Sequence, residues 1–180
     1  MTKHVELILG GARSGKSALA EQRAQSWLES GLVKELIYVA TAQSKDEEMA
    51  ERIAHHRASR LSCWKVIECP WHIAPLIASL SPSQCVLVDC LTLWLTYGLC
   101  EVEFPEYEKQ KSQLLTALQD TKGKVILVSN EVGHGIVPLG ALSRQFVDES
   151  GRLHQHIAAV ADHVDFVMAG LTLNLKSGQK

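Results

Sequence analysis

Apolar residues follow two different periods along this chain. Short and nearly continuous apolar runs predict strands that are buried on both faces of a sheet. They lie at residues 5–9, 36–40, 65–69, 85–88, 124–128 and 165–169. Longer segments with helical periodicity predict helices at residues 17–30, 45–59, 73–80, 106–120 and 142–161. This alternation predicts an α/β fold, with a mostly parallel central sheet and helices on both faces.

Size and composition narrow the class of protein. The chain has 180 residues, of which 46% are hydrophobic, and we expect a single domain over residues 1–180. Its formal net charge is -2, without the excess of basic residues that nucleic-acid binding needs. We therefore expect no nucleic-acid partner. No apolar stretch approaches the roughly 20 residues of a membrane span, which predicts no membrane insertion. The five cysteines contain no Cys-x-x-Cys pair, which favours free thiols in a reducing cytoplasm.

The first predicted strand leads into a glycine-rich segment that opens a helix. It consists of Gly10, Gly11, Ala12, Arg13, Ser14, Gly15, Lys16 and Ser17, and it matches the phosphate-binding pattern G-x-x-x-x-G-K-S/T. Backbone N–H groups in such a loop converge on phosphate oxygens, helped by the helix dipole. We expect Lys16 to reach the β- and γ-phosphates as a catalytic residue and Ser17 to ligate Mg²⁺. The sequence therefore predicts a P-loop NTPase.

Two later strands end in polar residues that would lie at the ligand-binding edge of the sheet. The run at residues 85–88 ends in Asp89, which we expect to hold Mg²⁺ directly or through water. The run at residues 124–128 leads to Asn130 and Glu131, which either contact substrate or shape the following loop. The chain lacks the Asn-Lys-x-Asp signature of regulatory GTPases, which disfavours that class.

Adjacent histidines lie on the second predicted helix. Residues three and four apart share a helix face, so His56 lies on the apolar face with Ile53, whereas His55 lies on a polar face. His56 is either a core histidine or a nucleophile that attacks an α-phosphate and carries the nucleotidyl group. In the second case, Arg57 and Arg60 would grip phosphates.

Several short blocks occur together along the chain. They include GGARSGKS at residues 10–17, YVATAQ at 38–43, DEEM at 46–49, RIAHHR at 52–57, VDCLT at 88–92, SNEVG at 129–133 and GIVP at 135–138. This combination resembles the bifunctional adenosylcobinamide kinase / adenosylcobinamide-phosphate guanylyltransferase family of cobalamin biosynthesis. The chain departs from the family pattern at Arg60-Leu61, where Arg-Pro is frequent, and at His154-Gln155, where Asn-Gln is frequent.

The resemblance implies an enzyme that works in two steps. It would phosphorylate adenosylcobinamide with ATP or GTP and then transfer GMP from GTP to adenosylcobinamide phosphate, giving adenosylcobinamide-GDP and pyrophosphate. The guanylyl group would pass through His56, and the enzyme would be a homotrimer. Nucleotide contacts would involve the P-loop and Thr41, Ala42, Gln43, Arg57, Ala58, Ser59, Arg60, Glu68 and Asp89.

Other functions are compatible with the motifs alone. One alternative is a plain P-loop small-molecule kinase in which His56 is structural. Another is an NTP-dependent assembly or regulatory ATPase, without a covalent intermediate. A platform for a flat corrin ring could be formed by Trp64, Trp71 and Trp94. However, these residues border apolar runs, which favours a role in the core.

Overall fold

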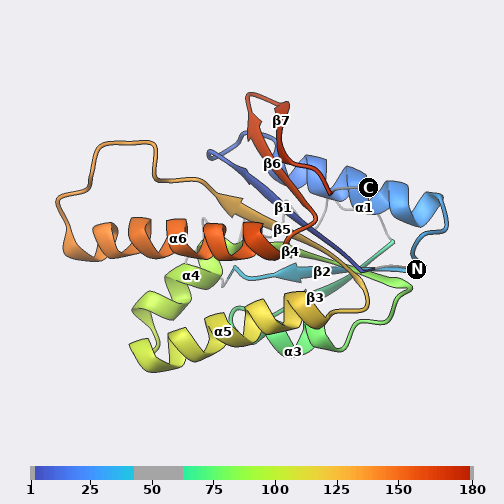
Figure 1. Cartoon of the computed structure of the whole chain (residues 1–180), viewed down its shortest axis with the longest axis horizontal. Coiled ribbons are helices and arrows are strands. Elements are labelled where there is room, and N and C mark those ends of the chain that lie inside the picture. Colours follow the sequence, from blue (N-terminus) through green and yellow to red (C-terminus); the bar gives the residue numbers. More distant parts are fainter. Residues whose placement is uncertain (1–2, 43–62, 179–180) are drawn as a thin grey trace.

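The computed structural model describes residues 3–42 and 63–178. Its strands are β1 (His4–Gly10), β2 (Glu35–Ala40), β3 (Trp64–Glu68), β4 (Gln84–Asp89), β5 (Lys124–Asn130), β6 (His163–Met168) and β7 (Leu171–Lys176). Within the described residues they form one seven-stranded sheet in the order β3-β2-β4-β5-β1-β6-β7 (Figure 1). Neighbouring strands are parallel, except that β6 and β7 pair antiparallel.

Helices cover both faces of this sheet. They are α1 (Lys16–Glu29), α3 (Ile73–Ala78), α4 (Leu91–Cys100), α5 (Phe104–Asp120) and α6 (Ala141–Val160). Helix α1 packs on one face, where Ala20 and Ala24 join buried side chains such as Ile8 and Leu87. The other four helices lie together on the opposite face (Figure 1). The predicted fold class is therefore confirmed.

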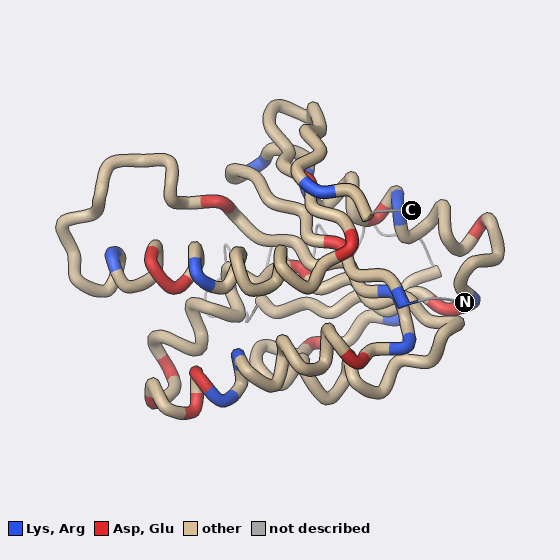
Figure 2. Tube along the Cα trace, in the orientation of Figure 1, with Lys and Arg blue, Asp and Glu red and all other residues tan. Residues whose placement is uncertain are grey.

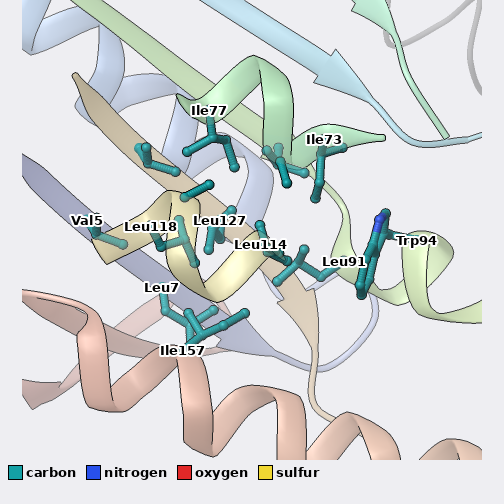
Figure 3. Packing of buried hydrophobic residues seen from close by; sticks show 14 of the residues in the cluster. Val5, Leu7, Ile73, Ile77, Leu91, Trp94, Leu114, Leu118, Leu127 and Ile157 are labelled. Carbon is teal, nitrogen blue, oxygen red and sulfur yellow. The ribbon is translucent and has the colours of Figure 1, made fainter. Parts of the chain in front are cut away.

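The larger part of the core lies between the sheet and these four helices. Leu114 of α5 and Ile157 of α6 converge on Val5, Leu7 and Leu127 of the central strands (Figure 3). The neighbouring strand residues point to α1 on the other face, because side chains alternate along a strand. Each central strand is thus buried on both faces, which explains why most of its sequence is a nearly continuous apolar run.

Trp64, Trp71 and Trp94 are buried, as the core interpretation predicts. Trp94 is fully buried and stacks on Trp71, with ring centroids 4.9 Å apart. Its indole Nε1 donates a hydrogen bond of 2.7 Å to the Trp71 carbonyl, so the buried donor is satisfied. Trp64 is also buried, at the end of the sheet, and its ring meets Tyr38 edge-on.

Two elements are absent from the sequence-based prediction. Helix α4 follows β4 almost directly, and both are apolar, so their periodicities merge into one hydrophobic run. Strand β7 is exposed along its whole length and, within the described residues, pairs with β6 alone, so it lacks the apolar run of a buried strand. The helix predicted at residues 45–59 lies outside the described residues.

The solvent side of the helices carries charges of both signs. Basic and acidic residues occur along both α5 and α6 (Figure 2). Some of them form pairs three residues apart, such as Lys109 with Glu106 at 3.1 Å. Among the described helices, none is both long and apolar enough to cross a membrane.

A buried cluster of charges joins α1 to the sheet. Arg23 of α1 donates a 2.7 Å hydrogen bond to Glu6 of β1 and pairs with Asp165 of β6. The side chains of Glu6 and Asp165 are only 7% and 1% exposed. Burial by itself would raise the pKa of Glu6, but hydrogen bonds from His4 and Arg23 outweigh it and hold that pKa below its usual value. Arg23 thus pairs with two carboxylates that are almost fully buried.

Replacing Arg23 should therefore destabilise the fold strongly. An Arg23→Met variant keeps much of the aliphatic stem but removes the guanidinium group that Glu6 and Asp165 share, and we expect a loss of about 3–5 kcal/mol in the free energy of unfolding. The matched control is Lys109→Met, which breaks an exposed pair and should cost at most about 0.5 kcal/mol. Urea unfolding at neutral pH measures the stability of both variants. Equal losses in the free energy of unfolding would show that the buried cluster contributes no more than an exposed ion pair.

Candidate active site

The P-loop has the strand–loop–helix geometry that its motif predicts. Strand β1 ends at Gly10 and α1 begins at Lys16, so the loop is confined to residues 11–15. The Ser14 N–H donates to the Gly11 carbonyl at 3.3 Å, which closes the turn. Arg13 and Gly15 have positive φ angles of 55° and 103°. These conformations wrap the backbone around the space in front of the helix N-terminus, where an anion is favoured.

Two side chains of the loop can meet a phosphate. Lys16 is buried, and its Nζ donates a 2.5 Å hydrogen bond to the Gly11 carbonyl, so the ammonium group lies over the loop. Burial lowers the pKa of Lys16, while the nearby Asp89 and Cys90 partly oppose that shift. The Ser14 hydroxyl is buried without a hydrogen-bond partner among the described residues. An unpaired buried hydroxyl in this loop fits a phosphate oxygen as its partner.

Backbone hydrogen bonds brace the P-loop from two distant segments. The N–H of Glu131, just after β5, donates to the Gly10 carbonyl at 3.0 Å. The N–H of Gly170, in the turn between β6 and β7, donates to the Ser14 carbonyl at 2.9 Å. The shape of the loop therefore depends on both neighbours of β1 in the sheet.

Asp89 lies at the same edge of the sheet, at the end of β4. Strand β5 separates β4 from β1, so Asp89 and the P-loop are two strand spacings apart, roughly 10 Å. The Tyr38 hydroxyl donates a 2.7 Å hydrogen bond to Asp89 Oδ2, which fixes the carboxylate. Ser17 lies in the first turn of α1. A carboxylate and a hydroxyl are oxygen donors of the kind that Mg²⁺ takes beside a phosphate, so the residues fit the ion.

The structure brings other predicted contact residues to this edge. Thr41 is buried, and its hydroxyl donates to the Cys90 carbonyl at 2.7 Å and accepts from the Cys90 N–H at 2.8 Å. It therefore joins the ends of β2 and β4. Ala42 follows it, half-buried, and Glu68 pairs with Ala40 in the sheet. The predicted site residues Gln43, His56, Arg57, Ala58, Ser59 and Arg60 lie outside the described residues.

Tyr38 and Thr92 have contacts at the site that sequence reasoning did not assign. Tyr38 orients Asp89, and the Thr92 hydroxyl accepts a 2.8 Å hydrogen bond from the Asn130 N–H. Both lie in blocks that mark the family resemblance. Their partners, however, depend on strand pairing, which a single sequence does not reveal. Composition gave no reason to link either residue to the sheet edge.

The loop after β5 exposes apolar side chains beside the site. Ile136 and Leu139 are 97% and 98% exposed. The loop also borders a cavity of about 360 Å³ against α4 and α6, lined by residues that include Leu99, Val132 and Phe146. On the far side of β1, strand β7 likewise exposes leucines along the sheet edge.

Fold and site together define the class as P-loop NTPase. The chain is similar to the flagellar accessory protein FlaH from Methanocaldococcus jannaschii, with a TM-score of 0.53 and 14% identity over 97% of this chain and 79% of that one. It is equally similar to a KaiC-like protein from Pyrococcus horikoshii, also with a TM-score of 0.53 and 14% identity over the same shares of the two chains. At this identity the likeness shows the fold.

Sequence comparison identifies the family. The model of the cobinamide kinase / cobinamide phosphate guanyltransferase family matches residues 6–175, and the chain belongs to that family. It is 50% identical over 172 residues to the bifunctional adenosylcobalamin biosynthesis protein CobP of Pseudomonas aeruginosa, covering 95% of this chain and 96% of that protein. It is 39% identical over 184 residues to the corresponding CobU of Salmonella typhimurium, covering 94% and 98%. The resemblance drawn from the sequence blocks is confirmed.

The first glycine of the P-loop should tolerate no side chain. A Cβ at Gly10, where φ is +153°, would lie 2.2 Å from the Val167 carbonyl oxygen and 2.9 Å from Ser14 Oγ. A Cβ at Gly11 would meet nothing within 4 Å. We expect Gly10→Ala to destabilise the protein without nucleotide by about 2 kcal/mol or more, and Gly11→Ala to leave that stability within about 0.5 kcal/mol. Thermal unfolding of the three proteins checks this, and equal midpoints would contradict the packing argument.

Proposed function

We propose that this chain catalyses both reactions in its family's name on an adenosylated substrate. It phosphorylates adenosylcobinamide with an NTP and then transfers GMP from GTP to the product, giving adenosylcobinamide-GDP and pyrophosphate. The observation that carries this proposal is a complete P-loop facing Asp89 in a chain that the family model matches from residue 6 to 175.

The kinase step relies on charge neutralisation at the P-loop. The acceptor hydroxyl attacks the γ-phosphorus, an O–P bond forms, and the bond to the β,γ-bridging oxygen breaks to release a nucleoside diphosphate. Lys16 and the loop N–H groups would stabilise the charge that develops on the phosphate oxygens. Ser17 and Asp89 would hold Mg²⁺, whose chemistry is to bind and neutralise the phosphate oxygens. We propose that either ATP or GTP can donate the phosphoryl group at this site.

The second step needs a nucleophile, and His56 is the residue we assign. Its imidazole nitrogen attacks the α-phosphorus of GTP, an N–P bond forms, and pyrophosphate leaves. The phosphate of adenosylcobinamide phosphate then attacks the guanylyl phosphorus, which breaks the N–P bond and restores the histidine. The other nucleotide contacts that we propose are Thr41, Ala42, Gln43, Arg57, Ala58, Ser59, Arg60 and Glu68.

Labelled GTP distinguishes this mechanism from a plain kinase. The protein and its His55→Ala, His56→Ala and Lys16→Ala variants are incubated with Mg²⁺ and GTP labelled at the α-phosphate, then denatured. We expect acid-labile, alkali-stable label on wild type and His55→Ala, and at least about a 100-fold loss in His56→Ala because the nucleophile is gone. Lys16→Ala should also lose label, because it weakens triphosphate binding.

The other outcomes of this experiment are equally informative. Label lost only from His55→Ala would move the nucleophile to the polar face of that helix. Phosphorylation of adenosylcobinamide without any labelled protein would favour the plain small-molecule kinase, with His56 structural. NTP hydrolysis with neither transfer would favour the assembly or regulatory ATPase.

We also propose a cytoplasmic homotrimer. The family resemblance supports the trimer, and the exposed apolar side chains offer surfaces for subunit contact. These are Ile136, Val137 and Leu139 in the loop after β5, and Leu171, Leu173 and Leu175 on β7, the last strand of the described sheet. An exposed apolar edge strand favours association. The five cysteine thiols are free, which supports a reducing compartment.

Light scattering during size-exclusion chromatography measures the assembly. The mass should be three times that of the 19.8 kDa chain. We expect Leu171→Lys/Leu173→Lys or Ile136→Lys/Leu139→Lys to weaken the trimer by at least about tenfold, since each would bury charge in a subunit contact. Lys109→Glu on the polar face of α5 serves as the control. A monomeric wild type at micromolar concentration would contradict the assembly.

A further inference from the structure

A buried chain of polar groups lies behind the end of β5, on the face covered by α4 and α6. His154 of α6 is 6% exposed, and its Nε2 lies 2.8 Å from the Ser129 hydroxyl. Ser129 is 2% exposed, and its hydroxyl lies 3.5 Å from that of Thr92 in α4. The Thr92 hydroxyl accepts the backbone N–H of Asn130 at 2.8 Å. Polar groups from two helices thus meet the last residues of β5.

The hydrogen bonds among these buried polar groups can all run in one direction, from Thr92 through Ser129 to His154. Burial lowers the pKa of His154, against the opposing effect of Glu131, which favours the neutral ring at pH 7. Thr92 accepts from Asn130, so it is free to donate to Ser129, which in turn donates to Nε2 of the neutral ring. The ring proton is then on Nδ1, which faces Glu131 Oε2 at 3.3 Å.

Glu131 continues the chain to the P-loop. Its carboxylate accepts the Gly133 N–H at 2.6 Å, and its own N–H donates to the Gly10 carbonyl at 3.0 Å. Its side chain is 18% exposed. Ser129 and Glu131 are therefore held on either side of Asn130, which leaves the backbone of Asn130 little freedom.

The alternation of side chains along β5 shows where Asn130 points. Val128 belongs to the core on the α1 face, and Ser129 contacts α4 and α6 on the opposite face. The side chain of Asn130 therefore points to the α1 side of the sheet. Its backbone pairs with Gly10 of β1. Strand β5 lies between β1 and β4, so this half-buried amide lies between the P-loop and Asp89. The hydrogen bonds of the described chain leave its side-chain amide unused.

We propose that Asn130 is a catalytic residue that contacts the transferred γ-phosphoryl group, and that His154 is a positioning residue that fixes it from the opposite face of the sheet. The proposal rests on the kinase half of the proposed function. An amide NH₂ between Lys16 and Asp89 supplies a neutral donor to a phosphate oxygen where negative charge is transferred. His154 acts through Ser129, Thr92 and Glu131, because all three hold the backbone on either side of Asn130.

Steady-state phosphoryl transfer from γ-labelled ATP to adenosylcobinamide tests the proposal with Asn130→Ala and His154→Leu. We expect kcat to fall about 100-fold in Asn130→Ala, because a donor to the transferred group is lost. In His154→Leu it should fall about tenfold or more, because that donor is misplaced. The KM for ATP should change less than about threefold in both, since ground-state binding is largely kept. His156→Leu, exposed on the same helix, is the matched control and should match wild type.

Two further variants separate positioning from a structural role. His154→Gln places an amide near the position of Nε2, and it should recover most of the activity that His154→Leu loses. The double variant His154→Leu/Asn130→Ala should be no slower than Asn130→Ala, because His154 acts through Asn130. Thermal unfolding confirms that every variant is folded at the assay temperature.

Several results would overturn the inference. They are full activity in Asn130→Ala, losses that multiply in the double variant, or a His154→Leu defect confined to stability or KM. If wild type hydrolyses ATP but phosphorylates no adenosylcobinamide, the proposed function fails instead. The same cycle is then measured on ATP hydrolysis, where Asn130 and His154 should show the same dependence.

Discussion

The parallel pairing of β1, β5 and β4 is the constraint on which the site depends. The register aligns Gly10 with Asn130, and Asp89 with Val128, so three strands deliver their last residues to one edge. Parallel strands need covered faces, and the helices provide that cover through the two cores. The hydrogen bond from the Glu131 N–H to the Gly10 carbonyl then links the end of β5 to the first residue of the P-loop, so the pairing of these strands also fixes the start of the loop. Phosphate binding is thus a consequence of how the centre of the sheet is packed.

Much of this arrangement could be predicted from the sequence, because the signals are local. Continuous apolar runs located the buried strands, and the P-loop motif located Lys16 and Ser17 at the start of α1. Asp89 could be placed at the ligand edge, since it ends such a run. The merged apolar pattern concealed α4, and the exposure of β7 concealed that strand. Local patterns therefore predicted the parallel strands of the sheet but not the antiparallel edge strand β7.

Contacts between distant residues could not be predicted. The order of strands decides that β5 separates the P-loop from Asp89, and several orders are compatible with the same run of elements. Tyr38 reaches Asp89 across the β2–β4 pair, and His154 reaches Ser129 from another helix. Each of these pairs is separated by many residues, and no periodicity links its members. The sequence offered no partner for His154, whereas the fold surrounds it with polar groups.

The brace from Gly170 to Ser14 has a consequence for the order of synthesis. Ser14 leaves the ribosome long before Gly170, so its carbonyl meets this partner only after residue 170 has emerged. Strand β6, which flanks β1, also comes after every other parallel strand. Between those two points of translation, the P-loop lacks one of its two braces. Nucleotide can therefore stabilise the complete site only after residue 170 has been made.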